Sequence, residues 1–350
     1  MNKINFIFIL LLNLIFSQNI FADLIKYPSF EINNFPSEVH GGVRATWDIT
    51  QDDDGIMYFA NTGGILIYDG SNWKTISIKE NPVIRSITKN HKNNILVSFS
   101  RSFGEITWNK KGKIIYNQIS EIPASSPYGI TELSKNNEYL ITQFKYLNLF
   151  VDGKLETIIK KKLKFERVSQ IGSNVYLSIR GKGLFLYKDR KLNIIKGTEV
   201  FKDRNQSVIN VFENKAGLIL VTRQSGIFSL INGNLTKFKI NNDLFNETTV
   251  FNGIKLKDGR YAIGSTNGLF VFDSDIDLKI HIGTDTGLQD NFIRSLYEDY
   301  QGNIWLGLND GISKVKLTSG ITMFEKKSAK INSIVNYAEK FNDELFLATS

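Results

Sequence analysis

Cationic and aromatic side chains recur at corresponding places along this chain, at intervals of about forty residues. One group lies between two short apolar segments, where a cation is followed by a ring or an amide, as in Arg223-Gln224. A second group consists of arginines near the start of apolar segments. Guanidinium groups bind carboxylate and sulfate bidentately, and neighbouring rings complement sugars. We therefore predict a small-molecule or oligosaccharide ligand, with an anionic glycan as the favoured class, bound by these residues: Arg85, Arg101, Phe103, Lys145, Tyr146, Arg167, Arg180, Arg223 and Arg294.

The simpler interpretation is that these cations are solvated loop residues. The chain carries 43 Lys+Arg against 35 Asp+Glu, a formal net charge of +8, so cations are frequent in any loop. The sequence by itself favours this interpretation. The charge is spread along the chain, and its densest cluster, 160–164, is a single short run typical of a solvated loop. We expect no nucleic-acid partner.

Catalytic patterns are missing. The three histidines, His40, His91 and His281, have no second histidine or carboxylate at a ligand spacing, and we expect them in loops or at the surface. The chain has no cysteine, which excludes thiolate chemistry and disulfides. The Gly-Gly pairs 41–42 and 63–64 precede strands and lack the helix that a phosphate loop needs. We predict no catalytic residue, no metal site and no cofactor, and that the chain is not an enzyme.

A repeated unit must position the predicted ligand-binding residues. Its clearest copy, 292–315, reads FIRSLYEDYQGNIWLGLNDGISKV and contains three short strands separated by two glycine turns. The same order recurs in 46–68, 208–230 and 250–272, and more weakly in 84–108, 130–150 and 168–187. Seven copies can be aligned.

The glycine that opens the third strand gives the period. It falls at Gly64, Gly104, Gly183, Gly226, Gly268 and Gly311, with Tyr146 in its place in the third copy. A fourth strand follows in several copies, for example at 73–78, 235–240 and 321–325. A period near forty with four strands is one propeller blade. The predicted fold is all-β, a β-propeller of four-stranded antiparallel blades with seven full blades plus a partial eighth.

Asp and Asn residues punctuate the turns of this unit. Asp52 to Gly55 and Asp299 to Gly302 join the first strand to the second, where positive φ angles are required. The run Asp52-Asp53-Asp54 superficially resembles a calcium loop. Because strand-like segments flank it and no closing Glu follows, we interpret it as a hairpin turn.

The N-terminus predicts export. Lys3 is followed by an apolar run, 6–16, too short to span a bilayer, and Ala22 precedes Asp23 in a small-residue cleavage pattern. We predict a cleaved signal peptide over 1–22 and a periplasmic location. No later segment reaches membrane-spanning length.

The repeats resemble a known family. The segment LYEDYQGNIWLGLNDGI at 296–312 is similar to the two-component regulator propeller repeat of bacterial hybrid histidine kinases. The segment WDITQDDDGIMYFANTGGILIYDGSNW at 47–73 resembles the opening repeat of the same group, and 83–87 with 102–105 fit its second repeat. The resemblance covers 45–350 and is weakest in the middle, where Tyr146 replaces a glycine.

The resemblance implies a non-catalytic, ligand-sensing input domain of a two-component or related signal-transduction regulator. In that family a triple-tyrosine domain, a membrane helix and an output module follow the propeller, and dimers form through these later segments. We therefore expect membrane contact only through downstream segments, and a homodimer is compatible with the resemblance. A free-standing periplasmic propeller that binds a protein partner is the alternative, and a polysaccharide lyase or hydrolase is a more remote one.

The end of the sequence falls inside a repeat. Segments 331–335 and 345–349 read as the first two strands of an eighth copy, which would leave a strand edge unpaired. We expect a fragment or a truncated gene, unless the extended stretch 27–35 pairs with this half-blade and closes the ring. The expected organisation is a signal peptide (1–22), an extended and ring-closing segment (23–44), the seven-repeat propeller (45–330) and the start of a further repeat (331–350).

Overall fold

The computed structural model describes residues 30–76, 78, 83–111, 113–122, 127, 129–134, 137–160, 163–317, 335–341 and 344–349. The predicted signal peptide, 1–22, lies outside the described residues. Contacts divide the chain into two units, of which the larger, Asn33–Val315, contains the propeller and the smaller draws on both chain ends.

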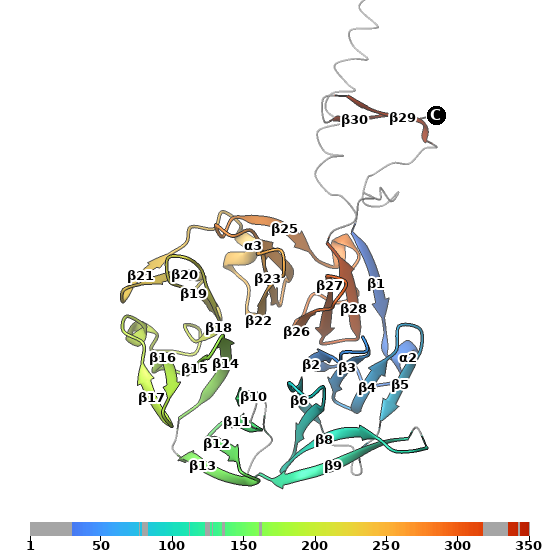
Figure 1. Ribbon diagram of the computed structural model, residues 1–350. Coiled ribbons are helices and arrows are strands. Elements are labelled where there is room, and N and C mark those ends of the chain that lie inside the picture. Colours follow the sequence, from blue (N-terminus) through green and yellow to red (C-terminus); the bar gives the residue numbers. More distant parts are fainter. Residues whose placement is uncertain are drawn as a thin grey trace, which may run out of the picture. The chain divides into compact units, whose positions relative to one another are not determined.

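Seven four-stranded antiparallel sheets form the ring shown in Figure 1, which confirms the predicted all-β propeller. Blade 1 consists of β2 (Thr46–Gln51), β3 (Met57–Asn61), β4 (Gly64–Tyr68) and β5 (Trp73–Ile76). Blade 2 consists of β6 (Ile84–Lys89), β7 (Ile95–Phe99), β8 (Ser102–Trp108) and β9 (Ile114–Glu121). Blade 3 consists of β10 (Gly129–Ser134), β11 (Glu138–Thr142), β12 (Tyr146–Val151) and β13 (Lys154–Lys160). Blade 4 consists of β14 (Phe165–Ile171), β15 (Asn174–Ile179), β16 (Gly183–Lys188) and β17 (Lys191–Ile194). Blade 5 consists of β18 (Val208–Glu213), β19 (Leu218–Thr222), β20 (Ile227–Ile231) and β21 (Asn234–Lys237). Blade 6 consists of β22 (Val250–Lys255), β23 (Tyr261–Ser265), β24 (Gly268–Phe272) and β25 (Leu278–Ile282).

Blade 7 is completed by a strand from the other end of the chain. Its strands β26 (Ile293–Glu298), β27 (Asn303–Leu308) and β28 (Ile312–Lys316) are joined on the outside by β1 (Glu31–Phe35). The side chain of Ser313 donates a hydrogen bond to Asn34 Oδ1 at 2.6 Å, and the Phe35 ring stacks on Trp305 at 5.7 Å. The sequence allowed the stretch 27–35 to pair with the half-blade at 331–350. That pairing is wrong, because β1 instead pairs with the outer edge of β28. The segment 321–325, expected as the fourth strand, lies outside the described residues.

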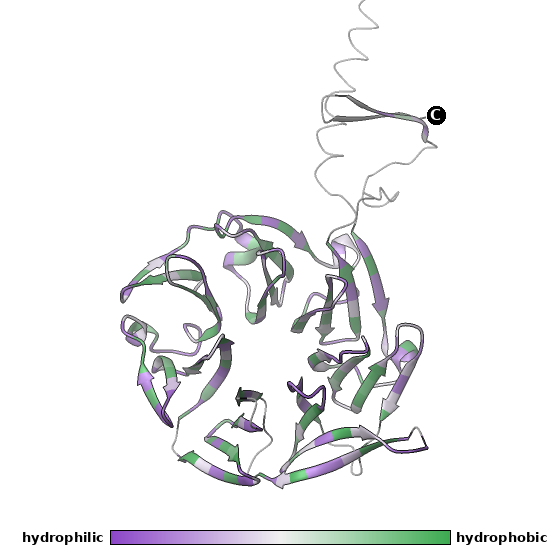
Figure 2. Ribbon diagram, in the orientation of Figure 1, coloured by the Kyte–Doolittle hydropathy of each residue, from purple (hydrophilic) through white to green (hydrophobic). Residues whose placement is uncertain are grey.

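The core lies between neighbouring blades. Second strands such as β7 (ILVSF) and β23 (YAIGS) are buried at every residue, because a blade on each side covers both of their faces. The cluster of Ile49, Phe59, Leu66, Trp305 and Ile312 packs blade 7 against blade 1 and so closes the ring. Figure 2 shows hydrophobic residues running through the strands around the whole ring.

The predicted Asp turns have a structural role. Asp52 accepts hydrogen bonds from Ile56 N at 2.8 Å and from the Tyr58 hydroxyl at 2.9 Å. Asp299 makes the equivalent bonds to Asn303 N and to Trp305 Nε1. Each aspartate thus fixes its own turn and a second-strand aromatic ring, as the hairpin interpretation requires.

Short helices lie between the strands: α2 (Ser37–His40), η1 (Thr198–Val200), α3 (Asp243–Asn246) and η2 (Thr284–Thr286). The stretch 23–44 was predicted to be extended, but α2 gives it a helical turn. His40 was predicted in a loop or at the surface, yet it is the last residue of α2 and its ring is buried against Trp73 at 5.7 Å. In the smaller unit, β29 (Val335–Phe341) pairs with β30 (Glu344–Thr349) in a two-stranded sheet. Among the described residues, no helix is long and apolar enough to cross a membrane.

Candidate ligand site at one end of the propeller channel

A bulge recurs near the start of the innermost strand in six of the seven blades. In each of them the pairing register with the second strand shifts across the second residue of the innermost strand. A β-bulge leaves one residue unpaired and redirects its side chain. The six bulged residues are Trp47, Arg85, Glu166, Ile209, Phe251 and Arg294. In blade 3 the shift falls later, between Glu132 and Ser134.

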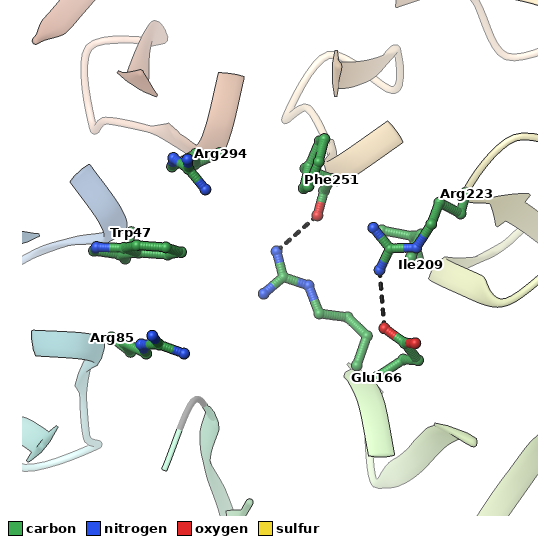
Figure 3. A pocket seen from close by; sticks show the side chains of 8 residues that line it. Trp47, Arg85, Glu166, Ile209, Arg223, Phe251 and Arg294 are labelled. Carbon is green, nitrogen blue, oxygen red and sulfur yellow. Dashed lines mark hydrogen bonds and ion pairs between the residues drawn. The ribbon is translucent and has the colours of Figure 1, made fainter. Parts of the chain in front are cut away.

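All six bulged residues line one cavity of about 200 Å³, together with Arg167 and Arg223 (Figure 3). Arg167 follows the bulge of blade 4, and Arg223 lies in the connection between the second and third strands of blade 5. The starts of the innermost strands and these connections lie at the same end of the channel, because the second strand runs back antiparallel to the first. The lining contains four guanidinium groups and one carboxylate, so the cavity is strongly cationic.

Two of these guanidinium groups cover Trp47. Arg85 lies 5.0 Å and Arg294 4.4 Å from the centre of the indole ring, one on each side of it in Figure 3. Arg294 also lies 4.5 Å from the centre of the Phe292 ring and donates to Asn309 Oδ1. Burial lowers the pKa of Arg294; the nearby Asp290 counteracts this and the charge of Arg85 adds to it. The Arg294 guanidinium group nevertheless remains charged at neutral pH.

The Glu166 carboxylate binds two further cations, Arg180 and Arg223. Glu166 Oε1 accepts a hydrogen bond from Arg180 Nε, and Oε2 accepts one from Arg223 Nη2 at 2.9 Å. The Glu166 side chain is 6% exposed and that of Arg223 is 11% exposed, so this cluster is largely shielded from water. Burial lowers the pKa of Arg223, and Glu166 opposes that shift.

Arg167 is held from across the channel. Its Nη2 donates to the carbonyl oxygen of Phe251 at 3.1 Å. Its charge also acts on Asp48, the residue after the bulge of blade 1. Burial raises the pKa of the Asp48 carboxyl to about 6, although the amide of Ile87 and the charge of Arg167 both lower it.

The predicted ligand-binding residues separate into two groups. The cavity brings together Arg85, Arg167, Arg223 and Arg294, and Arg180 adjoins it through Glu166. Arg101 and Lys145 are exposed, and Tyr146 is half-buried at the start of β12; none of the three is among the lining residues. Phe103 was wrongly predicted to face a ligand. It lies inside β8 with its side chain completely buried against Tyr139 and Phe150.

Four lining residues were missed: Trp47, Glu166, Ile209 and Phe251. They occupy the same repeat position as Arg85 and Arg294, two residues into the innermost strand. Aligning the repeats on that column would have found them. A criterion of positive charge alone missed this repeat position, because only Arg85 and Arg294 are cationic there.

Comparisons with known proteins agree with this architecture. Residues 287–310 match the family model described as "Two component regulator propeller", which confirms the resemblance for that repeat. No curated protein matches the sequence significantly.

Solved structures share the fold. The extracellular domain of BT3049 of B. thetaiotaomicron, described as a hybrid two component system, is 16% identical with a TM-score of 0.69, covering 92% of this chain and 47% of that chain. The extracellular domain of BT4673 of the same organism, described as a one component system, is 18% identical with a TM-score of 0.65, covering 84% and 40%. Virginiamycin B lyase of Staphylococcus aureus is 16% identical with a TM-score of 0.62, covering 83% and 100%. The chain thus spans less than half the length of the two extracellular domains.

Proposed function

From a ring of repeats of which 287–310 is a two-component regulator propeller repeat, we propose that this chain is a ligand-binding input domain of a signal-transduction regulator. It acts in the periplasm without catalysing a reaction. It binds an anionic ligand, with acidic glycans as the favoured class, in the cavity at the channel end.

The observation that supports this proposal most strongly is the convergence of four guanidinium groups around one cavity with a single carboxylate. Cations held together in a partly dehydrated site repel one another, and an anion entering between them relieves that cost. Among the described residues, the Nε atoms of Arg223 and Arg294 are buried without a hydrogen-bond partner. Buried donors left unpaired cost free energy that an acceptor on a ligand would recover.

The same lining favours binding over catalysis. Acid–base chemistry needs a group that is free to exchange a proton with the substrate. The one carboxylate of the lining, Glu166, already accepts hydrogen bonds on both oxygens from Arg180 and Arg223. The structural likeness to a lyase reflects the shared fold, and a fold by itself does not determine an activity.

The choice of variants follows from the ion pairs. Removing Arg180 or Arg223 would break one of the two ion pairs of the buried Glu166 carboxylate, and breaking a buried ion pair typically destabilises a protein by about 3–5 kcal/mol. Arg85 is better suited to a test because its side chain is exposed and it contributes one bulge residue to the cavity. Arg101, an exposed cation of the neighbouring loop outside the lining, is the matched control.

The test is a calorimetric titration of the purified chain with polygalacturonate and sulfated oligosaccharides, with neutral dextran for comparison. We expect binding to at least one of the acidic polymers and none to dextran. Arg85→Ala should weaken binding about tenfold or more, since a hydrogen bond to a charged group contributes roughly 1.5–3 kcal/mol. Arg101→Ala should change it less than about twofold. Equal losses in the two variants would indicate a diffuse charge effect and contradict a site in the channel.

A protein partner is the second candidate. It would use the outer surface of the ring instead of the cavity, so competition separates the two. A partner whose binding is unaffected by a saturating acidic ligand and by Arg85→Ala would favour the scaffold role.

A further inference from the structure

We infer that the cavity selects compact ligands with two acidic groups, one for Arg85 and one for Arg294. This inference rests on the proposed function and specifies its ligand. It follows from the way in which Trp47 separates these two cations, from the pairing of the remaining guanidinium groups and from the size of the cavity.

Trp47 acts as a spacer between two charges. With Arg85 at 5.0 Å and Arg294 at 4.4 Å from the ring centre on opposite sides, both faces of the indole are covered (Figure 3). The indole therefore cannot stack on a sugar ring, which is the usual role of tryptophan in a glycan site. Its negative π-faces instead hold two like charges in place. Because the ring lies between them, one carboxylate cannot make bidentate contact with both guanidinium groups.

The lining cations differ in their contacts with the protein, and Arg294 donates to the Asn309 amide oxygen and lies near Asp290. Arg223 forms an ion pair with Glu166. Arg167 donates a hydrogen bond to the Phe251 carbonyl oxygen, and its charge interacts with the Asp48 carboxyl. In the described part of the chain, neither Arg85 nor Arg294 forms an ion pair with a carboxylate, and Nε of Arg294 has no acceptor. Two separated cations without carboxylate partners call for two separated anionic groups.

The size of the cavity limits the ligand. Its volume of about 200 Å³ is below the 300–1,000 Å³ typical of sites for drug-sized molecules. On the side away from Trp47, Ile209 and Phe251 are the apolar lining residues beside Arg223 and Glu166, and they offer apolar contact to a carbon skeleton (Figure 3). The occupant is therefore a single unit of about monosaccharide size, or the acidic end of a longer chain, with both acidic groups on that unit.

Three six-carbon probes test this inference by calorimetry on the full chain: glucose (neutral), glucuronate (one carboxylate) and glucarate (two carboxylates). We expect no binding of glucose and at least tenfold tighter binding of glucarate than of glucuronate. Arg85→Gln and Arg294→Gln should each reduce the glucarate affinity to about that of glucuronate. Arg101→Gln is the matched control and should leave the affinity for both acids unchanged.

Several results would overturn the inference. They are equal affinities for glucuronate and glucarate, an unchanged glucarate affinity in folded Arg85→Gln, and binding of acidic polymers without binding of either hexose acid. In each case the titration with acidic polymers decides separately whether the proposed function stands. Arg85 is exposed, so Arg85→Gln gives a folded test even if Arg294→Gln destabilises the propeller.

Discussion

The guanidinium groups around the channel cavity differ in how far a neighbouring carboxylate neutralises them. Glu166 engages Arg180 and Arg223, whereas Arg85 and Arg294 lie on the faces of Trp47. Desolvation of a charge costs free energy unless a partner compensates for it. The same residue type therefore stabilises the fold in one blade and remains available to a ligand in another.

Asp48 should make ligand binding depend on pH. Its carboxyl accepts hydrogen bonds from the amides of Ile49 and Ile87 and has a pKa raised by burial to about 6. Above that pH its negative charge offsets part of the positive potential of Arg167. We expect the affinity for a carboxylate ligand to rise as the pH falls through about 6, measured by titration between pH 5 and 7.5.

Two variants check this assignment. Asp48→Asn should flatten the pH profile, and Asp54→Asn, which removes an exposed carboxyl in the turn after β2, should leave it unchanged. The same pKa shift also sets the direction in which the free energy of unfolding changes with pH. Because the pKa of Asp48 in the folded protein, about 6, exceeds its ordinary value of 3.8, its contribution to the free energy of unfolding falls as the pH rises between these values. A profile that persists in Asp48→Asn would assign the titration to another group.

At the scale of elements, two features are repeated from blade to blade. The bulge in the innermost strand directs one side chain toward the cavity in six of the seven blades, and the glycine near the start of the third strand allows a tight connection. Gly64, Gly183, Gly226, Gly268 and Gly311 all have positive φ angles. The glycine recurrence in the sequence is thus explained by the backbone conformation that this connection requires.

Gly268 should not tolerate a side chain. Its φ is +101°, and a Cβ added there would lie 2.3 Å from the Ile282 carbonyl oxygen. Gly259 is the matched control, because its φ is +91° but no atom lies within 4 Å of an added Cβ. We expect Gly259→Ala to cost about 1–2 kcal/mol from backbone strain and Gly268→Ala a further ~1–3 kcal/mol from the clash. Equal losses in denaturant unfolding would show that β25 moves aside freely.

Closure of the propeller depends on a contact between its first and last strands. β1 adds the outer strand of blade 7, and Phe35 packs against Trp73 of blade 1 and Trp305 of blade 7 at 5.2 and 5.7 Å. The ring is thereby fastened by residues that are far apart in the sequence. Such closure removes the free edge of β28, which would otherwise be open to pairing with another chain.

Removing β1 should destabilise the entire propeller. A chain that starts at residue 37 lacks β1, whereas one that starts at residue 30 keeps it. We expect the shorter chain to lose about 3 kcal/mol or more, from the exposed aromatic surface around Phe35 and the lost strand hydrogen bonds. Thermal unfolding of the two chains measures this difference. Identical midpoints would mean that the packing of blade 7 against blade 1 closes the ring without β1.

The sequence by itself determined the blades. Their period, the Asp turns and the third-strand glycines are local features, since each is set by the backbone geometry of a few consecutive residues, and they predicted seven four-stranded repeats correctly. It also grouped Arg85, Arg167, Arg223 and Arg294 with five other residues as one predicted ligand site. The tertiary structure alone decided which cations are paired, that Phe103 is buried, and that β1 joins β28. These outcomes depend on contacts between residues of different blades, whose distances no local pattern fixes.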